Sequence, residues 1–109
     1  MVRRKLRPEE VSLITWMIKN TDEPERVISE LKDLIVEEMT DGGIGSLRVV
    51  ISGEDKRVYS RELAKVDLFD IDQIPIFISI NLDADGNFFE LDVFKGDFSP
   101  LKKFPAIPQ

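Results

Sequence analysis

The chain has 109 residues, a mass of 12.5 kDa and a formal net charge of −6, and 42% of its residues are hydrophobic. This length predicts a single domain, residues 1–109, with one hydrophobic core. The absence of cysteine and histidine excludes disulfides, thiol nucleophiles, imidazole bases and the usual zinc ligands. Catalysis, if any, would have to use carboxylates, hydroxyls, lysine or arginine.

Residues 1–7 form a basic N-terminal arm, and all 21 acidic residues follow it. An acidic body repels phosphate backbones, so we expect no nucleic-acid partner. The arm runs directly into charged residues and lacks the apolar core of a signal peptide. No segment approaches the roughly 20 apolar residues that cross a bilayer. We therefore expect a cytoplasmic protein with no membrane association.

Two helices are expected after the arm. Pro8, Glu9 and Glu10 are typical of a helix start, because proline is tolerated in the first turn and acids suit the positive end of the helix dipole. Apolar residues then recur at helical spacing as far as Ile18. A second apolar stripe predicts a helix from about residue 23 to residue 39, ended by a glycine cap at Gly42 or Gly43.

Four antiparallel strands are expected in the rest of the chain. Alternating apolar residues predict strands at residues 47–52 and 57–69, and a change of parity in the latter indicates a bulge near Leu63 or Ala64. The predicted fold is therefore α+β, a two-layer sandwich of two helices on a four-stranded meander, in the order ααββββ. The strand at residues 47–52 would lie at an edge, so the protein is expected to be a monomer or an edge-paired homodimer.

The last two strands form the clearest pattern, because apolar residues alternate on both sides of the turn dipeptide Asp85-Gly86. Asp-Gly favours a two-residue type I′ turn. That turn predicts these cross-strand pairs: Leu82 with Phe89, Ile80 with Leu91, Ile78 with Val93, Asn81 with Glu90, Ser79 with Asp92 and Phe77 with Phe94. Residues 96–109 form an irregular tail with three prolines, and Phe98, Leu101 and Phe104 within it are expected to pin the tail across the core.

The hairpin also contains part of a calcium-binding pattern. Asn81, Asp83 and Asp85, followed by Gly86, match its oxygen-ligand half, but Asp92 occupies the twelfth position, where a bidentate glutamate is needed. Strands also flank the pattern where the motif requires helices. A hairpin turn explains the same residues, so we predict no metal and no cofactor. Asn81, Asp83, Asp85 and Asp92 stay as candidates for weak calcium binding.

A partner-binding surface is predicted on the outer face of the hairpin. Phe77 and Phe94 face each other there, and Asp67, Glu90 and Asp92 surround them. The alternative for this face is that the tail from Phe98 to Phe104 covers it. A second alternative is a hydrolase that uses these three carboxylates. Such chemistry needs carboxyls beside a cleft and one raised pKa, which a flat sheet face does not supply. We therefore predict no catalytic residues and a non-enzymatic module that binds another protein.

Three segments carry a resemblance to a known family: RKLRPEE, EEMTDGGIGSLRV and NLDADGNFFELDVFKGDFSPL. They resemble small bacterial proteins that are classed only as a domain of unknown function, and the resemblance spans Arg4 to about Leu101. It implies no catalytic residues. The size and α+β build are also similar to those of immunity proteins, which are acidic partners that neutralise toxins. That analogy implies a basic toxin as the partner, because opposite charges speed association.

Overall fold

The computed structural model describes residues 3–22, 24–39, 46–50, 59–105 and 107. The predicted glycine cap at Gly42 or Gly43 lies outside the described residues. Two helices and a sheet of six antiparallel strands confirm the α+β class, but the predicted number of four strands is wrong. Among the described residues, no helix is long and apolar enough to cross a membrane.

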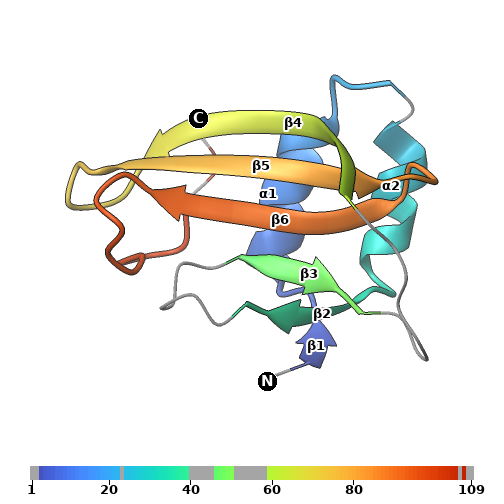
Figure 1. The fold of residues 1–109 in the computed structure, drawn as a ribbon, viewed down its shortest axis with the longest axis horizontal. Helices are drawn as coiled ribbons and strands as arrows, with labels where there is room; N and C mark the ends of the chain where they lie inside the picture. The colour runs from blue at the N-terminus through green and yellow to red at the C-terminus, as the bar shows by residue number, and fades with distance from the viewer. Residues whose placement is uncertain (1–2, 23, 40–45, 51–58, 106, 108–109) are drawn as a thin grey trace.

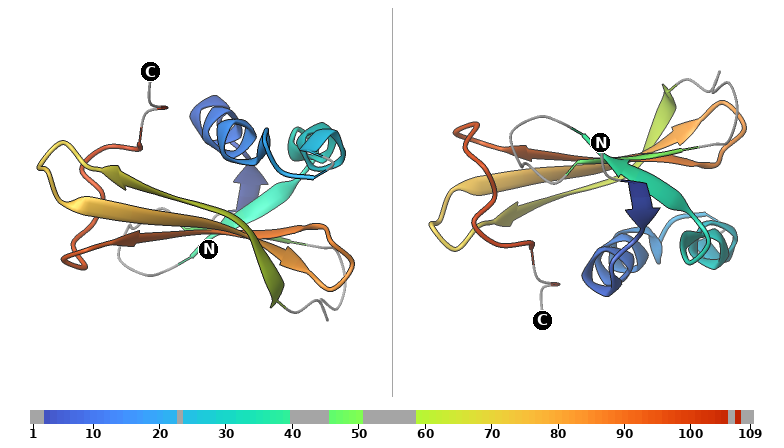
Figure 2. Two further views of the ribbon diagram at one scale, coloured as in Figure 1. Left: turned by 90° about the horizontal axis from the view of Figure 1, so that it is seen from above. Right: turned by 90° about the horizontal axis from the view of Figure 1, so that it is seen from below.

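The sheet has the strand order β1-β2-β3-β6-β5-β4 (Figure 1). The elements are β1 Arg3–Lys5, α1 Pro8–Ile18, α2 Pro24–Leu31, β2 Ile35–Glu38, β3 Leu47–Val49, β4 Tyr59–Phe69, β5 Pro75–Asp83 and β6 Phe88–Lys95. Both helices cover the same face of the sheet, which we call the inner face, and leave the outer face without a helix (Figure 2). The fold is therefore one layer of helices on one layer of strands.

The two unpredicted strands lie in the N-terminal part of the chain. The predicted basic arm contains β1, and the predicted second helix ends at Leu31 and is followed by β2. Ile35 and Val36 are β-branched and fit a strand better than a helix. Val36 is fully buried and pairs with Arg4 on β1 and Val49 on β3. Because β2 pairs with β3, this strand lies inside the sheet, and the prediction that residues 47–52 form a sheet edge is wrong.

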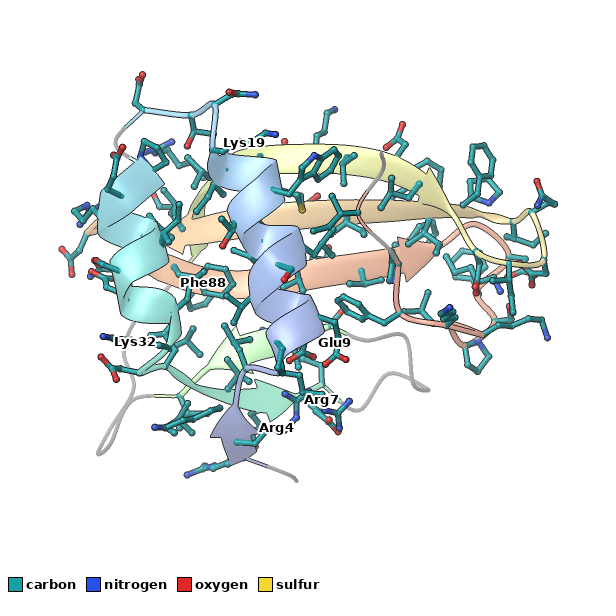
Figure 3. All side chains as sticks on the ribbon, turned by 180° about the vertical axis from the view of Figure 1, so that it is seen from behind. Arg4, Arg7, Glu9, Lys19, Lys32 and Phe88 are labelled. Carbon is teal, nitrogen blue, oxygen red and sulfur yellow. The ribbon has the colours of Figure 1, made fainter. Side chains whose placement is uncertain are left out.

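Helix α1 begins where it was predicted, and the contacts at its start explain why. Glu10 is buried and accepts a hydrogen bond from the backbone N–H of Arg7 at 2.7 Å, which caps the helix. Arg4 donates to both carboxylate oxygens of Glu10, at 2.8 and 2.9 Å, and to Glu38 at 3.1 Å. Burial raises the pKa of Glu10, but the hydrogen bonds from Arg4 and Arg7 outweigh it and lower the pKa below its usual value. This ion-pair network joins β1, α1 and β2 (Figure 3).

The hairpin of β5 and β6 has the predicted register over most of its length. Five of the six predicted pairs are confirmed: Ile80 with Leu91, Ile78 with Val93, Asn81 with Glu90, Ser79 with Asp92 and Phe77 with Phe94. The sixth is wrong, because a bulge pairs Leu82 with Phe88. Phe88 therefore enters the core beneath the helices. Phe89 is also buried, and the guanidinium of Arg48 lies 5.6 Å from its ring centroid.

The turn itself also differs from the predicted type I′ form. The backbone N–H of Asp83 donates to the carbonyl of Asn87 at 3.0 Å, so three residues, 84–86, make the loop. The Asp83 carboxylate accepts from the N–H groups of Asp85 and Asn87 at 2.9 and 3.0 Å. Gly86 has a φ of +80°, which glycine adopts readily. The Asp83 side chain thus selects the longer loop.

Strand β4 contains the predicted bulge, seen as a shift of register between Glu62 and Ala64. Beyond it, β4 pairs regularly with β5 as far as Phe69. The core lies between the helices and the inner face of the sheet. Its buried members are Leu13, Ile14, Ile18, Val27, Leu31, Val36, Leu47, Val49, Ile76, Ile78, Ile80, Phe88, Leu91 and Val93.

Candidate functional site

An exposed aromatic patch lies on the outer face at one end of β4, β5 and β6. We define it as Phe77, Phe94 and Phe98, whose exposed fractions are 40%, 37% and 72%. The ring centroids of Phe77 and Phe94 are 5.9 Å apart, and those of Phe94 and Phe98 are 4.9 Å apart with an edge-on geometry. Most single exposed apolar residues need no explanation, but three exposed aromatic side chains in contact with one another make this patch the candidate functional site.

Three of the five predicted partner-binding residues form one row across the strands. Asp67 on β4 pairs with Phe77 on β5, and Phe77 pairs with Phe94 on β6. Asp92 lies in the next row, opposite Ser79. Glu90 lies one row further, and its carboxylate accepts from the Asn81 amide at 2.9 Å. All five residues therefore share the outer face, as their parity predicted.

The row that contains Glu90 runs across the whole sheet. It takes one side chain from each of the six strands, in the order Arg3, Glu37, Arg48, Glu90, Asn81 and Glu62. Arg48 lies 3.5 Å from Glu90, and Arg3 lies 3.9 Å from Glu37. Opposite charges alternate along most of this row, so Glu90 is an internal member of a structural ladder. The outer-face carboxylates nearest the aromatic patch are therefore Asp67 and Asp92, and the row of Asp92 also contains Lys65 on β4.

Phe98 has an unusual backbone conformation. Its φ of +64° lies in the left-handed region, which bulky residues rarely adopt. Its N–H donates to the carbonyl of Lys95 at 2.9 Å, which closes a tight turn after β6. The hydroxyl and the backbone N–H of Ser99 donate to the Asp97 carboxylate at 2.6 and 3.0 Å, and these hydrogen bonds lower the pKa of Asp97. The prediction that Phe98, Leu101 and Phe104 pin the tail across the core is confirmed for Leu101 and Phe104. It is wrong for Phe98, whose side chain is exposed and packs against Phe94.

A buried ion cluster fixes the chain directly behind this turn. Lys95 is fully buried, and its ammonium donates to Asp70 at 2.9 Å and to Asp72 at 2.7 Å. Asp70 also accepts from the backbone N–H groups of Lys102 and Ile71, each at 2.7 Å. The Lys95 cluster, which we define as Lys95, Asp70 and Asp72, was missed by the sequence analysis. The sequence did contain a sign of it: Lys95 follows Leu91 and Val93 at alternate positions, so it is expected to point to the same inner face of β6.

The three groups of the Lys95 cluster keep one another ionised. Burial lowers the pKa of Lys95, but hydrogen bonds to Asp72 and Asp70 outweigh this and raise it. The hydrogen bond from Lys95 lowers the pKa of Asp72. Burial raises the pKa of Asp70, but hydrogen bonds from the Lys102 amide and the Lys95 ammonium lower it to about 2. A permanently charged, fully engaged cluster of this kind holds structure and does not supply a base or nucleophile.

The cluster also directs the tail. Lys102 is held at Asp70, so the chain after Phe98 passes around the end of the sheet to the helix side (Figure 2). There Leu101 and Phe104 pack against the core. The described part of the tail therefore adds Phe98 to the aromatic patch and leaves the rest of the outer face uncovered.

The Lys95 cluster makes folding stability depend on acid. The usual pKa of aspartate is 3.8 and that of Asp70 in the folded protein is about 2, so the unfolded chain binds protons more readily. The stability that ionised Asp70 contributes is therefore present well above pH 3.8 and should be lost as the pH drops toward 2. Urea unfolding at a series of pH values should show a smaller acid loss for Asp70→Asn than for the wild type. An equal loss in both proteins would contradict this assignment.

The calcium-binding candidates have other contacts. Asp83 is buried and closes the hairpin loop, while Asn81 donates to Glu90. Asp85 is exposed in that loop, and Asp92 accepts a long hydrogen bond of 3.4 Å from Ser46. Within the part of the chain that the structure describes, no three acidic residues are grouped so that they could hold a metal ion.

The hydrolase candidates are not joined by a described cavity. A pocket of about 220 Å³ lies at the end of β4, and its lining residues are Leu68, Phe69, Asp70, Ile71, Lys103, Phe104 and Pro105. None of Asp67, Glu90 and Asp92 lines it. The carboxylate that does, Asp70, is held by Lys95 and Lys102. The pocket therefore gives no support to acid–base chemistry by the three predicted carboxylates.

Comparison with protein families agrees with the resemblance found in the sequence. The model of a domain of unknown function, DUF6984, matches residues 3–105. The chain belongs to the DUF6984 family. The match includes the aromatic patch and the Lys95 cluster, so both lie within the DUF6984 domain. No curated protein and no solved structure is significantly similar to this DUF6984 protein.

Proposed function

We propose that this DUF6984 protein is a non-enzymatic module of the bacterial cytoplasm that binds another protein through the aromatic patch. The proposal rests on one observation: the side chain of Phe98 is exposed, although the backbone of this residue is held in a strained conformation. Residues in such conformations cost of order 1–3 kcal/mol and cluster at functional sites. A glycine at this position would avoid the strain, so the aromatic ring itself is the feature that needs a reason.

The composition of the patch supports a protein partner. Aromatic residues are enriched among those that dominate binding energy, because their large rigid surfaces lose little conformational entropy on binding. The rings of Phe77, Phe94 and Phe98 already pack together. Their arrangement is thus organised before binding, which lowers the entropic cost of association.

The charges beside the patch indicate the chemistry of the partner. Asp67 lies beside Phe77, Asp92 lies one row away, and Asp97 precedes Phe98. A partner that inserts apolar side chains among the rings and places lysine or arginine at these carboxylates would match the surface. A basic toxin has this character, so an immunity-like role fits the proposal.

The proposal is tested by Phe98→Gly, which removes the ring and relieves the backbone strain together. Glycine adopts the left-handed conformation readily, which should stabilise the variant by about 1 kcal/mol. Loss of the contact with Phe94 should destabilise it by about 1 kcal/mol. The free energy of unfolding should therefore change by less than about 1 kcal/mol. Capture of a partner from a lysate of the source cells, followed by mass spectrometry, should fall at least about tenfold.

Ile35→Ser is the control, because Ile35 is another exposed large apolar residue, at 38%, and lies outside the patch on β2. It should leave capture of the same partner unchanged, whereas Asp92→Lys should weaken it. A partner retained equally by the wild type and Phe98→Gly would show that the patch is not its binding surface.

A further inference from the structure

Strand β4 forms a long free edge of the sheet. It has 11 residues, and β5 is its only neighbour in the strand order of the described sheet (Figure 1). The opposite edge, β1, has three residues and carries the basic sequence RRK. Short, charged edge strands discourage pairing with another sheet, whereas long ones present unpaired N–H and C=O groups to it. The open edge of this sheet is therefore β4.

The part of β4 after its bulge is regular and has two distinct faces. Ala64, Val66 and Leu68 point to the inner face, where they are half-buried against the core. Lys65 and Asp67 point to the outer face and are exposed. The inner residues would gain burial if another strand joined this edge, because a neighbouring strand and its helices would extend the core.

The outer charges select one antiparallel register for a second copy of the same strand. If the two-fold axis passes through Val66, Lys65 of each copy lies opposite Asp67 of the other. Moving the axis to Lys65 would place Lys65 opposite Lys65, and moving it to Asp67 would place Asp67 opposite Asp67. A shift that placed the axis between residues would set inner side chains against outer ones. Only the register centred on Val66 joins opposite charges on the outer face and apolar residues on the inner face.

In the described sheet, the residues directly opposite Lys65 and Asp67 carry no charge. Lys65 pairs with Ser79 and Asp67 pairs with Phe77 on β5, and neither of these carries a charge. The bulge between Glu62 and Ala64 limits regular pairing to the segment after it. That segment contains both charges and Val66 at its centre.

We propose that two copies of this chain associate through their β4 strands, antiparallel and centred on Val66, to form one continuous sheet. A two-fold axis perpendicular to the sheet keeps all helices on one side and both aromatic patches on the other. The dimer would present two aromatic patches in the same direction, so it could bind a partner bivalently. This inference concerns the β4 edge and stands independently of what the patch binds.

The test is sedimentation velocity of the full chain over a wide range of concentration. The wild type should show a species of twice the 12.5 kDa monomer mass. Lys65→Asp would set an aspartate opposite Asp67 of the other copy, and Asp67→Lys would set a lysine opposite Lys65. Each change puts two pairs of like charges across the interface, so each variant should raise the dissociation constant about tenfold. The double variant exchanges the charges and restores both pairs, so its dissociation constant should return to near that of the wild type.

Lys32→Asp and Asp33→Lys are matched controls, because they make the same charge changes at exposed positions after α2. Neither should alter the dimer. A wild type that stays monomeric at all concentrations overturns the proposal. So does a dimer that the single variants leave unchanged, since it must then use another surface. Phe98→Gly should leave the dimer intact, which separates this result from a failure of the proposed binding function.

Discussion

Lys95→Met is expected to lower the midpoint of thermal unfolding by at least about 10 °C, because it leaves the buried carboxylate of Asp70 and the half-buried one of Asp72 without their cation. Asp70 would retain the two backbone N–H groups that donate to it, but both it and Asp72 would lose the ammonium between them. Methionine preserves most of the apolar volume of the lysine side chain. The drop in the midpoint would therefore come from the loss of the positive charge and not from a cavity in the core.

Circular dichroism would measure the midpoint, and hydrogen exchange would locate the damage. The N–H of Lys102, which donates to Asp70, should lose protection together with the rest of the tail. Lys32→Met is the control for removal of an exposed lysine and should move the midpoint little. Adding Asp70→Asn to Lys95→Met should recover part of the stability by removing one uncompensated charge. A wild-type midpoint for Lys95→Met would show that the cluster does not hold the fold together.

Phe88→Ala should reduce the free energy of unfolding by about 3–5 kcal/mol, which is the usual loss for a buried phenylalanine. Phe88 is 1% exposed and packs in the core beneath the helices because of the bulge opposite Leu82. Phe77→Ala is the matched control. It deletes the same atoms at a position that is 40% exposed, and it should cost roughly 1 kcal/mol through its contact with Phe94.

Urea unfolding of both variants would also test the hairpin register. In the two-residue turn predicted from the sequence, Phe88 would point to the outer face and its removal would cost no more than that of Phe77. Equal losses for the two variants would therefore favour that register over the bulged one. A difference of several kcal/mol would support the three-residue loop closed by Asp83.

Part of the candidate site could be read from parity alone. Alternation along β5 and β6 places Phe77 opposite Phe94 on the outer face, and the same rule on β4 places Asp67 beside them. Phe98 could not be found in this way, because it lies beyond the last strand and its position depends on the turn after Lys95.

The sequence by itself determined the elements whose signals are local: the start of α1 at Pro8, the bulge in β4 and most of the hairpin register. These depend on neighbouring residues and on which side chains share a face. Tertiary structure decided the rest. Strands β1 and β2 have three and four residues, too few for a pattern, and exist because they pair with each other and with β3. Lys95 is buried because Asp70 and Asp72, more than 20 residues away in sequence, compensate its charge there. Contacts between distant segments supply that free energy, and no local pattern records them.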